Sequence, residues 1–178
     1  ATMNGHTEIV RLLLDRGADP NIQNNNGITA LIRASDFGST RIVRLLLDRG
    51  ADPNSIGIYG RTALFWASSK GRIEIVRLLL DRGADPNIRD NFTDGNTALI
   101  YASRWGSTEI AKLLLDNGAD PNITDNDGDT ALIFASRSGH TEIVELLLDN
   151  GADPNIHMLN GETASMIAER RGHNDVAR

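Results

Sequence analysis

Arg-Leu-Leu-Leu-Asp-Arg-Gly-Ala-Asp-Pro-Asn stands at residues 11–21 and recurs unchanged at 44–54 and 77–87. Its last five residues, Gly-Ala-Asp-Pro-Asn, occur twice more, and the five copies follow one another at intervals of 33, 33, 35 and 33 residues. A Gly-x-Thr-Ala sequence follows every copy. A fixed period of roughly 20–50 residues is the signature of a protein made of stacked structural repeats. This period decides the fold class.

The repeats run along the whole chain, so we expect a single repeat domain over residues 1–178. Each unit begins two residues before its Gly-x-Thr-Ala sequence. Asn91 and Phe92 fall outside this division and lengthen one connection by two residues. The whole units are 25–57, 58–90, 93–125 and 126–158, and partial units lie at 1–24 and 159–178.

Each unit is predicted to form two helices. The threonine of Gly-x-Thr-Ala suits an N-cap, because its hydroxyl can accept a hydrogen bond from an unpaired N–H group of the first turn. The second helix carries apolar residues on one face, as in Ile42, Val43, Leu46 and Leu47. A glycine ends each helix, and a proline three residues after the second glycine prevents continuation. Two short helices cannot bury their apolar faces alone, so the sequence predicts an all-α array of stacked helix-turn-helix units.

Three motifs carry a family resemblance: Gly-x-Thr before the first helix, Gly-His-Thr-Glu-Ile-Val at 139–144, and the leucine triplet followed by Gly-Ala-Asp-Pro-Asn. With them, essentially the whole chain resembles the ankyrin repeat family. The resemblance implies an ankyrin-repeat solenoid whose β-turn fingers project from the helices. It also implies a concave surface of fingers and first helices that binds partner proteins. The Thr-Ala-Leu-Ile-x-Ala-Ser variant is similar to arrays of giant DNA viruses and intracellular bacteria.

The first helix departs from the family pattern. The family's Thr-Pro-Leu-His is replaced by a sequence without proline or histidine. The missing histidine removes a hydrogen-bonding group between neighbouring units, so we expect apolar contact from the residue in its place. The replacements are Thr-Ala-Leu-Ile at 29–32, 97–100 and 130–133, Thr-Ala-Leu-Phe at 62–65, and Thr-Ala-Ser-Met at 163–166.

The positions that differ most between units lie at the finger tips and at the end of the first helix. All eight aromatic residues lie at fingers or in first helices. Four of them are expected to face solvent, where aromatic side chains form binding hot spots. For the four in mid-helix, packing between units is the alternative. The first four are Phe37, Tyr59, Phe92 and Trp105, and the mid-helix four are Phe65, Trp66, Tyr101 and Phe134. The expected partner-binding residues are Phe37, Tyr59, Arg61, Trp66, Lys70, Phe92, Asp94, Tyr101, Arg104, Trp105 and Arg137.

The inserted pair Asn91 and Phe92 lengthens one finger, which we interpret as a specificity element.

Charges also form rows along the units. A row of arginines at the end of the first helices lies near acidic fingers, and two interpretations stay open: mutual neutralisation, or recognition of a partner of complementary charge. Cations along the second helices are interpreted as solubilising. The first row is Arg104, Arg137 and Arg170, the acidic residues are Asp94, Asp127, Asp129 and Glu162, and the second-helix cations are Arg11, Arg44, Arg77 and Lys112.

We expect no catalytic residue, no metal ligand and no cofactor. The chain has no cysteine, and its four histidines have neither metal-ligand spacing nor a neighbouring nucleophile. Residues 125–129, Asp-Asn-Asp-Gly-Asp, are similar to the start of a calcium-binding loop. However, the helix that begins at Thr130 leaves no place for the glutamate that such a loop needs.

The expected function is that of an intracellular, non-enzymatic scaffold for protein–protein interaction, in the cytoplasm of its own or of a host cell. The net charge of −6 argues against nucleic acid as the partner, and no apolar run approaches the length of a membrane span. We expect a monomer, with end-to-end association through uncapped apolar ends as the alternative. Because both ends break off within a helix pair, we expect a longer protein. A consensus-derived scaffold without a natural partner is the competing interpretation.

Overall fold

The computed structural model describes residues 6–91 and 94–173. Its helices follow one another in pairs, as the repeats predict, and the contacts divide the chain into two compact units, Ala1–Asp85 and Pro86–Arg178, each described by itself. The first unit holds α1 (Thr7–Asp15), α2 (Ala30–Phe37), α3 (Thr40–Asp48), the 3₁₀ turn η2 (Ile58–Gly60), α4 (Ala63–Ser69) and α5 (Ile73–Asp81). The second holds α6 (Ala98–Arg104), α7 (Thr108–Asp116), α8 (Ala131–Ser138), α9 (Thr141–Asp149) and α10 (Ala164–Arg171).

The first helices α2, α4, α6, α8 and α10 all begin at the predicted threonine. In α6 the Thr97 hydroxyl accepts a hydrogen bond from the Ile100 N–H at 3.3 Å, and the other four helices repeat this bond. Glycine caps end three of these helices; Gly139, for example, closes α8 in the left-handed conformation, with a φ of 72°. The helices α4 and α6 end one residue earlier than predicted, because Lys70 and Trp105 take the cap position before the glycine.

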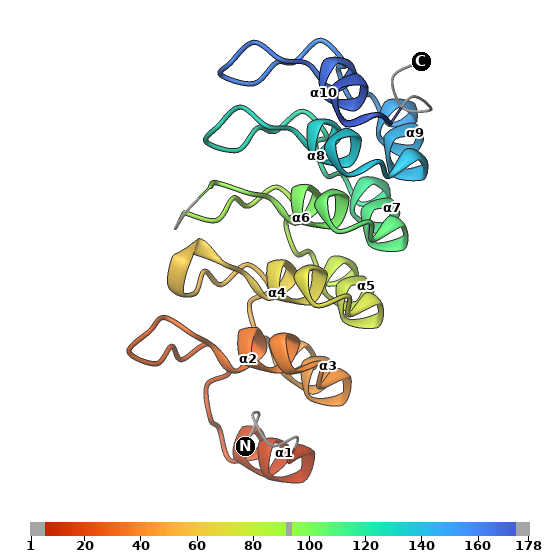
Figure 1. Cartoon of the computed structure of the whole chain (residues 1–178). Helices are drawn as coiled ribbons and strands as arrows, with labels where there is room; N and C mark the ends of the chain where they lie inside the picture. The colour runs from red at the N-terminus through yellow and green to blue at the C-terminus, as the bar shows by residue number, and fades with distance from the viewer. Residues whose placement is uncertain (1–5, 92–93, 174–178) are drawn as a thin grey trace. The chain divides into compact units, whose positions relative to one another are not determined.

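Leucines and alanines of both helices in a pair form the core. In the first unit α2 packs against both α3 and α4, and in the second α8 packs against α6, α9 and α10. Figure 1 shows this pairing, with the long loops projecting to the side away from the second helices. The middle leucine of the triplet is almost completely buried on four second helices. These leucines are Leu46, Leu79, Leu114 and Leu147.

An asparagine side chain joins each Gly-Ala-Asp-Pro-Asn segment to the next. Asn54 Nδ2 donates to the Gly83 carbonyl at 3.0 Å, and its Oδ1 accepts from the Asp85 N–H at 2.7 Å. We call these two bonds the asparagine clamp. The strict repeat of these residues therefore has a structural cause: the asparagine of each copy binds the next copy, and the glycine carbonyl and aspartate N–H of each copy are bound by the one before it. The same two bonds link Asn21 to Gly50 and Asp52, Asn87 to Gly118 and Asp120, and Asn122 to Gly151 and Asp153.

The residues that replace the family's histidine are apolar contacts at four of five places. Ile32, Phe65, Ile100 and Ile133 are buried, as expected. Met166 is not, since 53% of it is exposed. The expectation is wrong for Met166, because α10 is the last first helix in the described residues and packs against α8 on one side.

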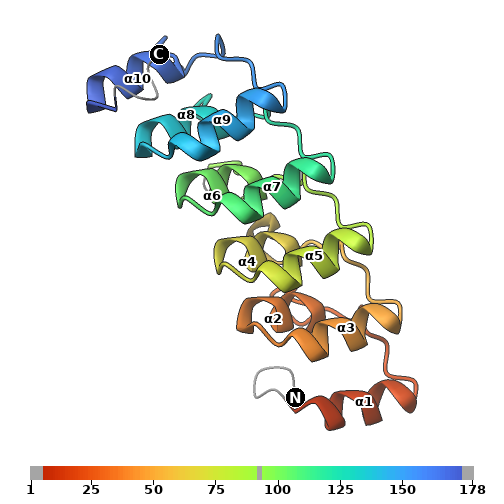
Figure 2. The same cartoon turned by 90° about the vertical axis from the view of Figure 1, so that its right-hand side faces the viewer.

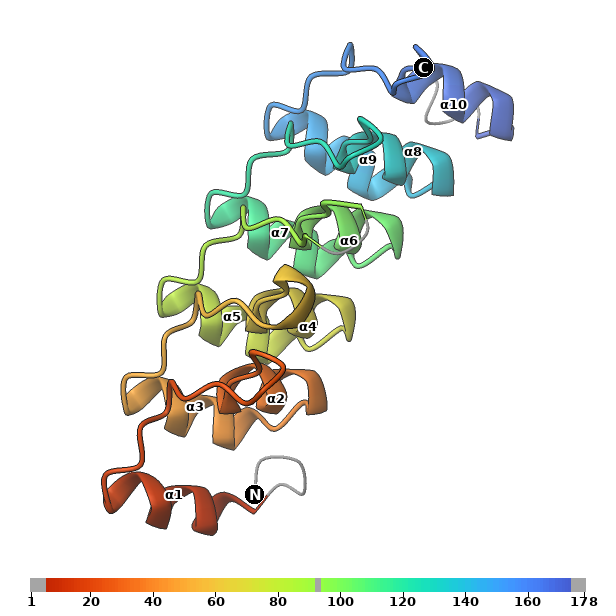
Figure 3. The ribbon, with the colours of Figure 1, turned by 90° about the vertical axis from the view of Figure 1, so that its left-hand side faces the viewer.

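The fingers are the loops that precede each first helix, and an Asn or Asp side chain folds the tip of the first and fourth. Asn24 Oδ1 accepts hydrogen bonds from the N–H groups of Asn26 and Ile28, at 2.9 and 3.0 Å. Asp125 Oδ1 accepts the equivalent pair in a later finger. Figure 3 looks onto the fingers. These local bonds fix the loop that presents the variable residues.

Candidate functional site

In the first unit, Arg61 lies among three aromatic rings. Its guanidinium carbon is 4.7 Å from the centroid of the Phe65 ring, 5.3 Å from that of Trp66 and 5.8 Å from that of Tyr59. Phe65 and Trp66 meet edge to face, with their centroids 5.8 Å apart. Phe65 is buried and Trp66 is half-buried, so Phe65 belongs to the core and Trp66 to its edge. Cation–π contacts of this kind hold a guanidinium and its rings in one arrangement.

Tyr59 sits in this cluster with an unusual backbone. Its φ is 68°, the only positive φ outside glycine among the described residues. In this finger Gly57 stands where the first finger has Asn24, so no side chain at that position folds the tip, and the loop contains the 3₁₀ turn η2. A bulky residue in this conformation costs of order 1 kcal/mol or more, and such strain is common at functional positions.

Phe37 and Lys70 complete the first unit's share of the expected site. Phe37 is 47% exposed at the end of α2, and the guanidinium of Arg33 lies 5.9 Å from its ring centroid. Arg33 also pairs with Asp36 at 3.7 Å. Lys70 is exposed at the C-cap of α4. Both residues therefore lie at the ends of first helices, where the sequence places them.

The second unit contributes a separate group around α6. Trp105 follows α6 and is 68% exposed, while Tyr101 is half-buried within the helix. The guanidinium of Arg104 lies 5.1 Å from the ring centroid of Phe134, which is itself buried. Asp94 belongs to the finger before α6, and its carbonyl accepts a short hydrogen bond of 2.6 Å from the Asn126 N–H. Two neighbouring fingers are joined by that bond.

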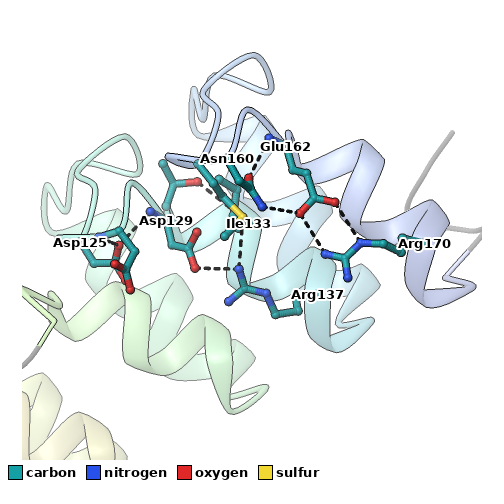
Figure 4. A network of polar contacts seen from close by, with 10 residues as sticks. Asp125, Asp129, Ile133, Arg137, Asn160, Glu162 and Arg170 are labelled. Carbon is teal, nitrogen blue, oxygen red and sulfur yellow. Dashed lines mark hydrogen bonds and ion pairs between the residues drawn. The ribbon is translucent and has the colours of Figure 1, made fainter.

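Two of the three arginines in the predicted row are paired with acids of the fingers. Arg137 donates to Asp129 Oδ2 at 2.7 Å, and its guanidinium lies 4.9 Å from the Phe134 ring centroid. Arg170 makes two bonds to the Glu162 carboxylate, at 2.9 and 3.0 Å. Figure 4 shows both pairs. At these two positions the structure favours mutual neutralisation.

A comparison of the sequence with family profiles matches it to the family described as ankyrin repeats (3 copies), over residues 1–90, 58–125, 89–158 and 118–178. These matches together cover the chain. The chain belongs to the ankyrin repeat family. A comparison with curated protein sequences gave no significant match.

Arg89 is an ankyrin finger residue that the sequence analysis missed. Its Nε donates to the Gly95 carbonyl at 2.9 Å, and its Nη2 donates to Asn126 Oδ1 at 2.9 Å. The finger lengthened by two residues is thus held both to itself and to the next finger. The sequence alone could have pointed to Arg89, because it places an arginine where other ankyrin units of the chain have Gln23 or Thr124. Phe92, the residue assigned to specificity, lies outside the described residues.

Two carboxyl groups of the ankyrin fingers have shifted pKa values. Burial raises the pKa of Asp125 above its ordinary 3.8, against the lowering effect of the N–H groups of Asp129 and Asp127. The negative charges of those two side chains raise it further. The side-chain amide of Asn160, followed by Arg170, lowers the pKa of Glu162. The Glu162 contacts therefore stabilise the fold above its ordinary pKa and weaken as the pH falls below it.

Asp125→Asn should raise the free energy of unfolding at pH 7 by about 0.5–1 kcal/mol. Asparagine keeps the acceptor Oδ1, as Asn24 does in the first finger, and removes a buried charge beside two other acids. Since the folded-state pKa of Asp125 is raised, the wild-type carboxyl takes up a proton as the pH falls through it. The advantage should therefore disappear below about pH 3.8. Urea unfolding at pH 7 and pH 3 measures both values.

Asp125→Ala is the matched control, because it removes the charge together with the acceptor. It should lower the free energy of unfolding by about 1–2 kcal/mol at either pH. A less stable Asp125→Asn protein at pH 7 would show that the charge itself is needed.

Within residues 6–91 and 94–173, no group of three or more His, Asp or Glu side chains is arranged to hold a metal ion. Asp125 uses Oδ1 to fold its own finger, and Asp129 uses Oδ2 to bind Arg137. In the same residues no helix has the length and apolar character needed to cross a bilayer.

Proposed function

We propose that this ankyrin array is an intracellular scaffold that binds a partner protein through its fingers and first helices. Ankyrin repeats generally mediate protein–protein interaction. The observation that carries the proposal is Trp105, a tryptophan that is 68% exposed at the end of the first helix α6. A side chain of this size gains much from burial against a partner, and tryptophan is among the residues most enriched at binding hot spots.

Each unit offers its own group of binding residues in this proposal. In the first, Phe37 and Tyr59 are exposed aromatic anchors, Arg61 stacks on Tyr59 and on Trp66, and Lys70 adds a charge at the end of α4. In the second, Trp105 is the anchor. Tyr101, Arg104, Asp94 and Arg137 of the same unit are proposed to supply further polar and aromatic contacts to the partner.

The preorganised side chains support binding rather than catalysis. Stacking on Phe65 and Phe134 fixes Arg61, Arg104 and Arg137 before a partner arrives, which lowers the entropy cost of association. The arginine row does not favour nucleic acid, because Arg137 and Arg170 are already bound to carboxylates. The role proposed is therefore a non-enzymatic one, with neither metal nor cofactor.

Replacing Phe37, Tyr59 and Trp105 by alanine together should reduce capture of a partner protein from cell lysate by at least about tenfold. The matched control replaces Ile9, Leu12 and Leu13, which are exposed apolar residues of the second helix α1. A protein that is enriched on the native chain and on the control, and lost on the triple aromatic variant, would support the proposal. Equal recovery on all three baits would contradict it.

A further inference from the structure

The second helices α1, α3, α5, α7 and α9 can be compared at two charged positions, and two of them depart from the common pattern in opposite directions. Each helix carries charged residues at its second and fifth positions, three residues apart. The usual pair is acidic then basic, which is favourable at this spacing on a helix. In α3 both positions are arginine, and in α9 both are glutamate. The pairs in chain order are Glu8 and Arg11, Arg41 and Arg44, Glu74 and Arg77, Glu109 and Lys112, and Glu142 and Glu145.

The arginine pair of α3 lines a groove of the first unit. The groove lies between α1 and α3, has a volume of about 590 Å³, and is lined by Arg11, Arg41, Arg44 and Arg49 together with Glu8 and Asp48. Figure 2 looks onto α1, α3 and α5, the side away from the fingers of this unit. It is therefore a different surface from the one proposed to bind a partner protein.

Arg41 interrupts a ladder of ion pairs between these helices. Arg44 Nη2 lies 3.7 Å from Glu74 Oε1 on the next second helix. The equivalent partner of Arg11 would be residue 41, which is an arginine, and Arg11 instead lies 3.8 Å from Glu8 of its own helix. No carboxylate among the described residues lies within ion-pair distance of Arg41. The groove thus holds a cation that the fold itself does not neutralise.

The glutamate pair of α9 forms an acidic surface in the second unit. Glu142 and Glu145 are both exposed, and Glu142 accepts a long hydrogen bond of 3.4 Å from the Thr108 hydroxyl. No cation among the described residues lies within ion-pair distance of Glu145. Asp149, one turn further, is exposed as well.

The net charges of the two units have the same signs as these helix pairs: the unit that contains α3 is positive, and the unit that contains α9 is negative. The sequence 1–85 has eleven Lys and Arg against nine Asp and Glu, and 86–178 has seven against fifteen, so their formal charges are +2 and −8. Complementary charge of this kind steers association and fixes its register.

We propose that two copies of this chain associate with α3 of one copy against α9 of the other, where Arg41 and Arg44 pair with Glu142 and Glu145. A second copy is the occupant because the complementary surface stands in the same chain, at the same two helical positions and with the same spacing. A polyanion such as nucleic acid fits less well, since Glu8 and Asp48 also line the groove. Each helix alone carries two like charges that repel each other. When α3 of one copy meets α9 of the other, each of these charges faces an opposite one, which offsets the repulsion.

Sedimentation of the 178-residue chain tests this association. Exposed ion pairs are individually weak, so the contact is expected at protein concentrations on the order of 0.1–1 mM and at low salt. The average mass should rise above 19.3 kDa with concentration at about 20 mM salt and return to that value at about 0.5 M salt. A mass of 19.3 kDa at every concentration and salt would overturn the proposal.

Charge reversal locates the contact. Arg41→Glu with Arg44→Glu, and separately Glu142→Arg with Glu145→Arg, should each give a monomer, because α3 and α9 then carry the same sign. Mixing the two variants should restore association, with a constant within about threefold of the native one, since every α3 again finds an α9 of opposite sign. Arg16→Glu with Arg171→Glu is the control that matches the net-charge change of the arginine reversal at two other exposed sites, and it should still associate.

Association that survives high salt and both reversals would place the contact at exposed apolar residues such as Ile9 and Leu13, and would also overturn the proposal. Circular dichroism of each variant confirms folding. Since α3 and α9 carry none of the proposed partner-binding residues, the outcome does not depend on the proposed function.

Discussion

Leu79→Ala should lower the free energy of unfolding by about 3 kcal/mol. Leu79 is the middle leucine of the triplet on α5 and has no exposed surface. Alanine removes three carbons, and the surrounding helices of the pair cannot close the space, so the lost contacts add to the lost burial. Urea unfolding followed by far-ultraviolet circular dichroism measures the change.

Leu13→Ala is the matched control, because Leu13 is the middle leucine of the first triplet and is 53% exposed. The same chemical change should cost less than about 1 kcal/mol there. Equal losses for the two variants would contradict the account of the core, in which the repeated leucine stabilises only where a neighbouring helix covers it.

Asn122→Ala should lower the free energy of unfolding by about 1–2 kcal/mol. Its side chain makes two bonds to the next Gly-Ala-Asp-Pro-Asn segment, from Nδ2 to the Gly151 carbonyl at 3.0 Å and from the Asp153 N–H to Oδ1 at 2.7 Å. Alanine removes both bonds and leaves the polar groups of the neighbouring segment to solvent. The coupling between adjacent helix pairs should weaken, so the urea transition should also broaden.

Asn155→Ala tests the same asparagine at a place without the clamp. In the described residues the Asn155 side chain bonds only to Asp153, two residues before it. The loss in free energy of unfolding should be below about 0.5 kcal/mol. If Asn122→Ala were equally mild, the strict repeat of this asparagine would need a cause other than the clamp.

The parts of the fold that depend on local bonds were predicted from the sequence. The threonine N-caps bind an N–H three residues ahead, so Thr97 and its equivalents place the start of each first helix without knowledge of the rest of the chain. The buried stripe of α3, from Ile42 to Leu47, likewise depends only on helical spacing. The helix ends at Lys70 and Trp105 are one residue off, which is the usual precision of helix boundaries.

The geometry of the candidate site was less predictable, because it depends on contacts across loops. Of the three rings around Arg61, Phe65 and Trp66 belong to α4, and Tyr59 comes from η2, in a finger where Gly57 stands at the position of Asn24. The comparison of Gly57 with Asn24 was available in the sequence and would have indicated an altered finger. The charge reversals at Arg41 and Glu145 were also visible in the sequence, but only their neighbour Arg44 was interpreted, as part of a solubilising row. Their meaning depends on which side chains already have partners, and only the structure shows that.

The central claim is that a partner protein binds the fingers and first helices. Hydrogen–deuterium exchange of the chain, alone and in complex with a captured partner, tests it most directly. The account expects protection in the finger and first-helix segments 57–70 and 94–105, with unchanged exchange in α3, α5, α7 and α9. Protection confined to those four second helices would contradict it.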